Sequence, residues 1–495
     1  MSKHINKLTL SIVCLFFFAQ TLNAQWTSPG DGTTYTLTDL VEIGCVHHDY
    51  ANSVYSIMTD ITISATDKLY INGNDEPNSL LFNENNLTLT IKGSMVVEGT
   101  EDSHYYIGMP VYAEHGRIRF EDASEPNHFS RCDFFNLSGI QIIGSDVTFN
   151  DCNIIAFNTF SQSSTVSFSN CNPIFTDCSF IYNEGAAISS PANGQGSPQI
   201  VNCHFTNNVT SNANQPQINL GPGSNDTIRI MGCTIEGGGN NMVGGIAIAD
   251  LMGTGATKIL LKDNIVRNNR YGYNQQGYNL NSVINGNRFF DNNFETNPMN
   301  GGSGISIYGM DENNKAVLRN NVITGNLWGI TVINAADVDL GTEDDWGRNQ
   351  IHDNGNGGVL YDLYNNTPFD IMAVGNYWGT TNGQEIEDHI FHQSDDPSLG
   401  LVNYIPFLTD DAVNEVKTTG FEVWPNPVSN GSFTLVLDEA TPSEVVIYNL
   451  KGQKVASEHI ENKVNTINVS ALGSGIFVVE VNHAEKKIVK RIIIE

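Results

Sequence analysis

The chain has 495 residues, and its 54 acidic residues outnumber its 24 lysines and arginines, which gives a formal net charge of −30. Almost all of this excess lies between residues 25 and 420. DNA, RNA and anionic membranes are bound through Lys and Arg, so the charge argues against nucleic acid as a partner. The length indicates two or more domains, or one long array of repeats.

Residues 1–24 have the pattern of a secretory signal peptide. Lys3 and Lys7 form a positive start, an apolar run follows, and small residues precede an expected cleavage between Ala24 and Gln25. The apolar run is too short to span a bilayer, and no other segment is long enough. We therefore expect a mature chain without a transmembrane segment, which passes through the periplasm and is secreted or displayed on the outer-membrane surface.

Residues 25–130 are interpreted as an N-terminal cap followed by the first coils of a repeat structure. Alternating apolar and polar residues bounded by Gly or Asn predict four strands, at 60–63, 68–71, 87–91 and 94–97. A stack of repeats must cover its first apolar layer, so we expect the cap near residues 26–55.

Between residues 131 and 380 one three-residue pattern returns ten times, at intervals of 20 to 34 residues. Its first position is Cys or a small polar residue, its second is nearly always polar, and its third is large and apolar. The segments begin at Cys132, Cys152, Cys178, Cys203, Cys233, Asp263, Asn287, Asn321, Asn349 and Asn376. Such alternation predicts a strand with one buried face, and the spacing predicts a solenoid.

A repeat of about 27 residues holds three short strands, and runs such as Gly245–Ile248 and Gly304–Ile307 mark the other strands of the coil. The pattern resembles the right-handed parallel β-helix repeat family, which implies an all-β solenoid. Five residues past the first position an Asn recurs, which we interpret as a left-handed turn residue. These residues are Asn183, Asn208, Asn268, Asn292, Asn326 and Asn354.

Seven cysteines remain after residue 24, and five of them occupy the first position of successive coils. Side chains stacked in this way point in parallel, which is a poor geometry for a disulfide. We expect a buried ladder of free thiols. A disulfide, with Cys171 to Cys178 the first choice, and a metal site remain alternatives.

After the last coil, which Trp378 closes, we expect a C-terminal cap at residues 381–407. It would contain a short helix near residues 385–392 and an edge strand near 403–407. Residues 408–420 have the composition of a linker.

Residues 421–495 form a separate region of short strands. Pro425, Asn426 and Pro427, then Gly452 and Gly475, carry a resemblance to the type IX secretion sorting domain, type A, of the Bacteroidetes. The resemblance implies a small β-sandwich, passage through the type IX machinery, and removal by its sortase-like protease.

The polar positions of the repeated strand form an exposed parallel sheet, where enzymes of this fold build their sites. We expect Lys262 and Arg288 to lie on neighbouring coils, where a second cation would lower the pKa of the lysine as a base requires. With His204 they are the candidate catalytic residues of a polysaccharide lyase or hydrolase. A solvated sheet face is the alternative.

Two further groups of residues are candidate binding sites. Asp337, Asp339, Asp344 and Asp345 lie in the densest acidic loop and are candidate Ca²⁺ ligands, against the alternative of a solvated loop. Tyr271, Tyr273, Tyr278, Tyr308 and Trp328 are candidates for an aromatic ridge that stacks on sugar rings, against the alternative of packing between coils.

These observations predict a secreted or surface-displayed β-helix that binds or displays an extracellular polysaccharide or a surface partner. The first alternative is the lyase or hydrolase described above. The second is a structural spacer without a ligand.

Overall fold

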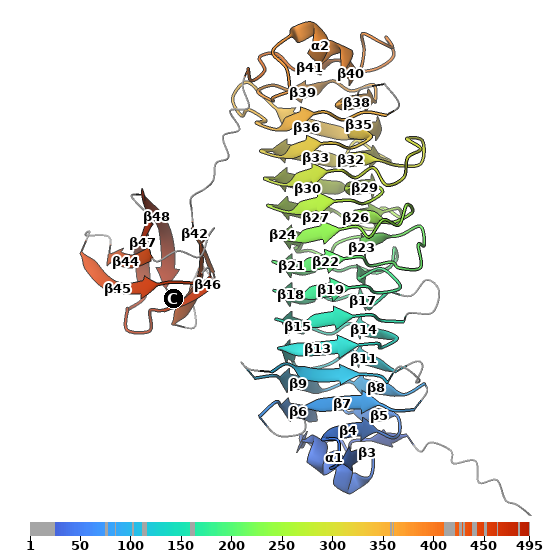
Figure 1. The fold of residues 1–495 in the computed structure, drawn as a ribbon, viewed down its shortest axis with the longest axis vertical. Coiled ribbons are helices and arrows are strands. Elements are labelled where there is room, and N and C mark those ends of the chain that lie inside the picture. The colour runs from blue at the N-terminus through green and yellow to red at the C-terminus, as the bar shows by residue number, and fades with distance from the viewer. Residues whose placement is uncertain are drawn as a thin grey trace, which may run out of the picture. The chain divides into compact units, whose positions relative to one another are not determined.

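The computed structural model describes residues 25–74, 78–84, 86–100, 103–110, 116–158, 164–356, 359, 361–409, 421–424, 428, 431–437, 443–449, 453–462, 464–483 and 486–494. The chain divides into two compact units, residues 1–409 and residues 410–495. The described part of the first unit is a stack of coils whose strands form three long sheets (Figure 1). The strands pair in parallel except for one antiparallel pair at the N-terminal end of the third sheet.

Sheet A has 14 strands among the described residues, and neighbouring coils pair in parallel along its whole length. Its strands, in spatial order, are β1 (Trp26–Thr27), β5 (Ile61–Ile63), β8 (Thr88–Ile91), β11 (Arg117–Glu121), β14 (Gly139–Ile143), β17 (Val166–Ser169), β20 (Ile188–Ser189), β23 (Pro216–Leu220), β26 (Gly244–Asp250), β29 (Tyr273–Gly277), β32 (Ser303–Gly309), β35 (Trp328–Asn334), β38 (Leu363–Asn366) and β40 (Ile390–Phe391).

Sheet B follows sheet A in every coil and also has 14 described strands. They are β2 (Thr34–Tyr35), β6 (Lys68–Asn72), β9 (Ser94–Glu98), β12 (Asn127–Ser130), β15 (Val147–Asn150), β18 (Ile174–Thr176), β21 (Gln199–Val201), β24 (Thr227–Met231), β27 (Thr257–Lys262), β30 (Leu280–Asn285), β33 (Lys315–Arg319), β36 (Asp337–Gly341), β39 (Ile371–Ala373) and β41 (Val402–Asn403).

Sheet C completes each coil and contains the repeated three-residue pattern; 13 of its strands are described. They are β3 (Val46–Asp49), β4 (Val54–Ile57), β7 (Ser79–Phe82), β10 (Tyr105–Gly108), β13 (Cys132–Phe135), β16 (Asn153–Ile155), β19 (Ser179–Ile181), β22 (His204–Thr206), β25 (Thr234–Glu236), β28 (Ile265–Arg267), β31 (Arg288–Phe290), β34 (Val322–Thr324) and β37 (Gln350–His352). The all-β solenoid expected from the sequence is confirmed, as are the four strands expected before residue 100.

The apolar third position of the pattern forms a continuous interior file. Phe180 pairs with Phe205 and Phe205 with Ile235, and all three are fully buried. The two phenyl rings stack with centroids 4.8 Å apart. The next residue in the file is Val266, because Ile235 pairs with Val266 and not with Ile265. The expected segment beginning at Asp263 is therefore wrong by one residue, since in a strand a shift of one exchanges the two faces.

The first position of the pattern forms a second file, in which cysteines give way to asparagines. The five stacked cysteines are buried, and all seven cysteines of the described chain are free thiols. From Cys233 onward the file continues as Asn264, Asn287, Asn321, Asn349 and Asn376. Each amide nitrogen donates to the next amide oxygen at 2.8–3.0 Å, so these buried polar groups satisfy one another along the axis.

A second amide file lies at the corner between sheets C and A. It runs through Asn183, Asn208, Gln217, Asn269, Asn292, Asn326 and Asn354, and it ends on the carboxylate of Asp362. The left-handed residue at this corner is the preceding one, such as Tyr182, Asn207 or Asp353. The recurring Asn was therefore correctly located but wrongly interpreted as the turn residue, except at Asn268, which does have positive φ.

Both ends of the solenoid are covered. At the N-terminal end, helix α1 (Leu37–Ile43) begins at a Thr36 capping box with Asp39 and buries Leu37 and Leu40. At the other end, helix α2 (Gly383–Asp388) buries Ile386, close to where a short helix was expected. The edge strand expected near residues 403–407 is wrong for residues 404–407, because the strand here, β41, covers only Val402–Asn403.

The second unit contains seven described strands in two antiparallel sheets around a separate core. One sheet has the order β42 (Phe421–Trp424), β43 (Ser432–Leu437), β46 (Val464–Asn468). The other has the order β45 (Lys454–Ile460), β44 (Ser443–Asn449), β47 (Gly475–His483), β48 (Lys486–Ile494). This arrangement is the small sandwich that the sequence predicts.

Candidate functional site: a polar pocket between sheets B and C

A cavity of about 530 Å³ opens at the corner where the chain passes from sheet B to sheet C, across three successive coils. Asn285 and Arg319 line it from the ends of β30 and β33. Asn320 and Arg348 also line it. Each lies at the corner that follows sheet B, where the backbone is left-handed, with φ of 58° and 51°. The remaining wall is the loop that carries Glu343, Asp344, Asp345 and Trp346.

The pocket forms where the corner loop between β36 and β37 is longer than those of the coils just before it. From β12 to β34 the chain crosses this corner within two residues, as between Met231 and Thr234 or between Asn285 and Arg288. The corners between β6 and β7 and between β9 and β10, near the N-terminal end, are longer. In the pocket coil, β36 ends at Gly341 and β37 begins only at Gln350. Insertions on a regular scaffold are where repeat proteins carry binding residues.

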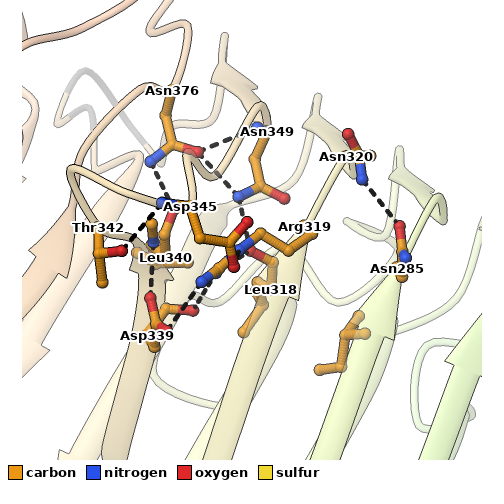
Figure 2. A network of polar contacts seen from close by, with 12 residues as sticks. Asn285, Leu318, Arg319, Asn320, Asp339, Leu340, Thr342, Asp345, Asn349 and Asn376 are labelled. Atoms are coloured by element: carbon orange, nitrogen blue, oxygen red, sulfur yellow. Dashed lines mark hydrogen bonds and ion pairs between the residues drawn. The ribbon is translucent and has the colours of Figure 1, made fainter. Parts of the chain in front are cut away.

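Arg319 holds this loop in place. Its Nε donates to Asp345 Oδ2 at 2.9 Å, its Nη2 donates to Asp339 Oδ2 at 2.8 Å, and its Nη1 donates to the carbonyl of Asp339 at 3.1 Å (Figure 2). The Arg319 side chain is only 10% exposed, and its partner Asp339 is less exposed than Asp345, so the ion pair with Asp339 is the better shielded from solvent. Arg319 thereby connects the loop to β36.

Trp346 is the apolar element of the pocket. A Cβ on Gly375 would come within 2.5 Å of its ring, so the indole lies directly against the backbone of the following coil. The side chain is nonetheless 37% exposed. The pocket therefore combines a positioned aromatic surface with guanidinium, amide and carboxylate groups, the chemistry typical of sites for polyhydroxylated ligands.

The structure does not bring the three candidate catalytic residues together. Lys262 ends β27 in sheet B, pairs with Met231 and Asn285, and forms an ion pair with Asp263 at 3.4 Å. Arg288 lies in sheet C, where it pairs with Ile265 and Val322. His204 lies in the same sheet but three strands away, about 14 Å. Lys262 and Arg288 do lie on neighbouring coils, as expected. The expectation that they share one exposed sheet is wrong, because Lys262 belongs to sheet B and Arg288 to sheet C.

The candidate aromatic residues mostly pack against the solenoid. Tyr273 is fully buried in the core, Tyr271 lies over Gly244, and Tyr278 lies over Gly253. Tyr308 points outward from β32, where it is partly buried. Their arrangement does not form the exposed ridge that the sequence suggests.

Trp328 belongs to a different aromatic cluster near the C-terminal cap. Its ring stacks on Tyr361 with centroids 5.3 Å apart, and its Nε1 donates to the carbonyl of Pro298. Tyr364 stacks on Phe391 beside them. Because these ring faces cover one another, the cluster is better suited to sealing the last coils than to stacking on a ligand.

The four acidic candidates have different partners. Asp339 and Asp345 bind Arg319, Asp337 binds Lys315 at 3.0 Å, and Asp344 lines the pocket. Among the described residues no group of three or more His, Cys, Asp or Glu side chains is placed to hold a metal ion. The sequence identified this loop by its acidity but missed Trp346, which no recurring spacing marks. Arg348 lies directly before the repeated segment at Asn349 but was not among the candidate site residues.

The remaining candidates concern export. Ala24, Pro425, Asn426, Pro427 and Gly452 lie outside the described residues, and Gln25 is the first described residue. Gly475 begins β47. In the part of the chain that the structure covers, neither helix has the length and apolar character needed to cross a membrane.

Two parts of the chain match known families. Residues 422–495 match the secretion system C-terminal sorting domain, and residues 225–384 match a protein family of unknown function, DUF1565. No curated protein sequence matches the chain.

Among solved structures, the chain is similar to the periplasmic alginate epimerase AlgG. A mutant of that enzyme is 12% identical, with a TM-score of 0.45 over 76% of this chain and 84% of that chain. A second AlgG structure is 11% identical, with a TM-score of 0.42 over 76% of this chain and 81% of that chain. The likeness concerns the fold alone.

The fold and the family matches define the class: this is a parallel β-helix protein with a type IX secretion sorting domain. The sorting domain marks the chain for export by the type IX machinery, to secretion or to attachment at the cell surface, in a bacterium of the Bacteroidetes.

Proposed function

We propose that this exported β-helix binds an extracellular glycan, and that the pocket between sheets B and C is the binding site. The observation that carries the proposal is the combination, in one cavity of about 530 Å³, of Trp346 with the polar groups of Asn285, Asn320 and Arg348. A cavity of this size suits one or two sugar units.

Each lining group has a role that sugar chemistry requires. The Arg348 guanidinium and the two amides donate to hydroxyl oxygens, and the carboxylates of Glu343 and Asp344 accept from hydroxyl hydrogens. The indole of Trp346 offers an apolar surface to the C–H face of a pyranose ring. Arg319 does not need to touch the ligand, because its ion pairs position the loop.

Calorimetry of the purified protein against a panel of neutral, amino and uronic oligosaccharides tests the proposal. Trp346→Ala is expected to weaken binding of the best ligand at least tenfold, and Arg348→Ala at least threefold. Tyr182→Ala is the matched control, since Tyr182 is 56% exposed at another corner of the solenoid and should leave binding unchanged. Equal binding by wild type and Trp346→Ala contradicts the site.

The same panel, incubated with the protein and analysed by mass spectrometry, tests the alternative enzymatic function. A binding protein returns every oligosaccharide intact. Cleaved or unsaturated products from any of them would contradict a purely binding role.

We infer the export route from the two ends of the chain. The signal peptide directs the chain to the periplasm with cleavage after Ala24, and the sorting domain is then removed by a sortase-like protease within residues 408–420. The mature protein is expected to begin at Gln25 and to lack residues 421–495. Mass spectrometry of the exported protein tests both ends, and accumulation in the medium of a chain that retains residues 421–495 would contradict the route.

A further inference from the structure

The charges around the pocket do not balance. Arg319 is compensated twice, because its guanidinium contacts both Asp339 and Asp345 at 2.8–2.9 Å. Glu343 and Asp344 are exposed on the loop, and within the described residues neither forms an ion pair. Arg348 is the remaining cation of the lining. The pocket and the ion pairs that support it contain two guanidiniums, those of Arg319 and Arg348. They contain four carboxylates, those of Asp339, Glu343, Asp344 and Asp345, so their net charge is negative.

We propose that the pocket selects a sugar that carries a positive charge, namely a hexosamine unit with a free, protonated amino group. This inference rests on the proposed function and specifies its ligand class. A protonated amine has three N–H donors and no acceptor, so it fits carboxylates that no internal cation occupies. Glu343 and Asp344 provide two such carboxylates on the rim of the cavity.

Three further properties favour an amino sugar over neutral or acidic sugars. An ammonium group near the face of Trp346 gains a cation–π attraction. The formal charge of −30 attracts cationic ligands and repels polyuronates at a distance. The hydroxyls of the same ring still find donors in Arg348 and in the two asparagine amides, so the rest of the pocket is not left unsatisfied.

The Asn285–Asn320 pair orients the donors on the opposite wall. Asn320 Nδ2 donates to Asn285 Oδ1 at 3.0 Å, which fixes one amide relative to the other on adjacent coils (Figure 2). A ligand hydroxyl that meets these amides is held across the cavity from the acidic loop. The amine and the hydroxyls of one hexosamine unit therefore have separate partners.

The test is calorimetry of the full chain with three matched disaccharides: the β-1,4 disaccharide of glucosamine, its fully N-acetylated form, and cellobiose. The amine form is expected to bind at least tenfold more tightly than the other two at low salt, and the advantage should shrink at 0.5 M NaCl because exposed charges are screened. The double variant Glu343→Gln, Asp344→Asn should reduce the advantage to threefold or less. Glu312→Gln, which removes one exposed negative charge elsewhere, should leave it intact.

The outcomes separate this inference from the proposed function. Equal affinity for all three sugars, lost in Trp346→Ala, contradicts the amine preference but supports glycan binding at this pocket. A requirement for Ca²⁺, with affinity lost in EDTA, would also contradict the inference, since a metal ion would then occupy the carboxylates. Absence of any Trp346-dependent binding would overturn both.

Discussion

At the residue scale, the buried amides explain how a mostly apolar interior tolerates polar side chains. Asn321 accepts from the backbone N–H and the amide of Asn287, and donates to Asn349 and to the carbonyl of Ile284. Every polar atom of the side chain is thus used along the axis. Removing one member leaves groups of both neighbouring coils without partners in a buried position.

Asn321→Ala is therefore expected to lower the free energy of unfolding by about 3 kcal/mol, since it orphans several buried groups that cost about 1–3 kcal/mol each. Asn281→Ala, at an exposed position of β30, should change it by less than about 0.5 kcal/mol. Urea denaturation of the two variants measures the difference. Equal midpoints would show that the amide file contributes nothing to stability.

The second amide file ends on a buried carboxylate that contacts a histidine. Asp362 is 1% exposed, accepts from Asn354 Nδ2 at 2.8 Å, and meets His389 Nδ1 at 3.2 Å. The hydrogen bond with Asp362 raises the pKa of His389 above its ordinary value. The pKa of His389 is thus higher in the folded protein than in the unfolded chain. The contact between His389 and Asp362 therefore stabilises the fold fully at a pH below the ordinary histidine pKa. This stabilisation is lost as the pH rises through the pKa of the folded state.

We expect the melting temperature of the solenoid to fall as pH is raised from 6 to 9, and expect His389→Gln to show a smaller fall over that range. Calorimetric scans of both proteins at several pH values provide the comparison. If the melting temperatures of the wild type and of His389→Gln fell by the same amount over this pH range, the ion pair between His389 and Asp362 would be excluded as the cause.

At the scale of elements, the pocket loop depends on one glycine. Gly375 has φ of 70°, and a Cβ there would meet the Trp346 ring at 2.5 Å. Gly375→Ala is expected to cost about 1–2 kcal/mol of stability and to weaken ligand binding, because the indole must move. Tryptophan fluorescence and calorimetry check the two effects. Gly383→Ala is a fair control, as nothing lies within 4 Å of its Cβ position.

Strand prediction succeeded where the pattern was strong and failed where two registers fit equally well. Cys132, Cys178 and Phe180 lie inward as expected, because Cys–polar–Phe fits only one register. Around Asn264 the run Lys262–Val266 alternates acceptably in either register, and the amide file decides it through contacts to Cys233 and Asn287. Such contacts between coils have no signature within the local sequence.

The candidate site was only partly predictable for a related reason. The acidic loop was visible as a run of Asp and Glu, which suggested Ca²⁺. The partner that determines the role of Asp339 and Asp345 is Arg319, which lies in the preceding coil. The role of Trp346 became visible only when the insertion at this corner could be compared with the two-residue corners of the coils just before it.

At the scale of the whole molecule, the solenoid and the sorting domain have separate cores, which agrees with a chain built to be exported and then divided. The solenoid keeps its cysteines reduced although its destination is oxidising. Burial raises the pKa of Cys152 and Cys203, which favours the protonated thiol at these two positions.

Thiol titration follows from this arrangement. The mature, unreduced protein should react with a thiol reagent at seven sites when unfolded in guanidinium, and much more slowly when native. Fewer than six reactive thiols after unfolding would mean that a disulfide has replaced part of the ladder.

The central claim is that the insertion between β36 and β37 turns a regular solenoid corner into a sugar-binding pocket. A crystal structure of the full chain soaked with the glucosamine disaccharide tests it most directly. The account predicts a pyranose ring over Trp346, with its amino group within hydrogen-bonding distance of Glu343 or Asp344 and its hydroxyls on Asn320 or Arg348. Sugar density on another face of the solenoid, with this pocket holding only water, would contradict it.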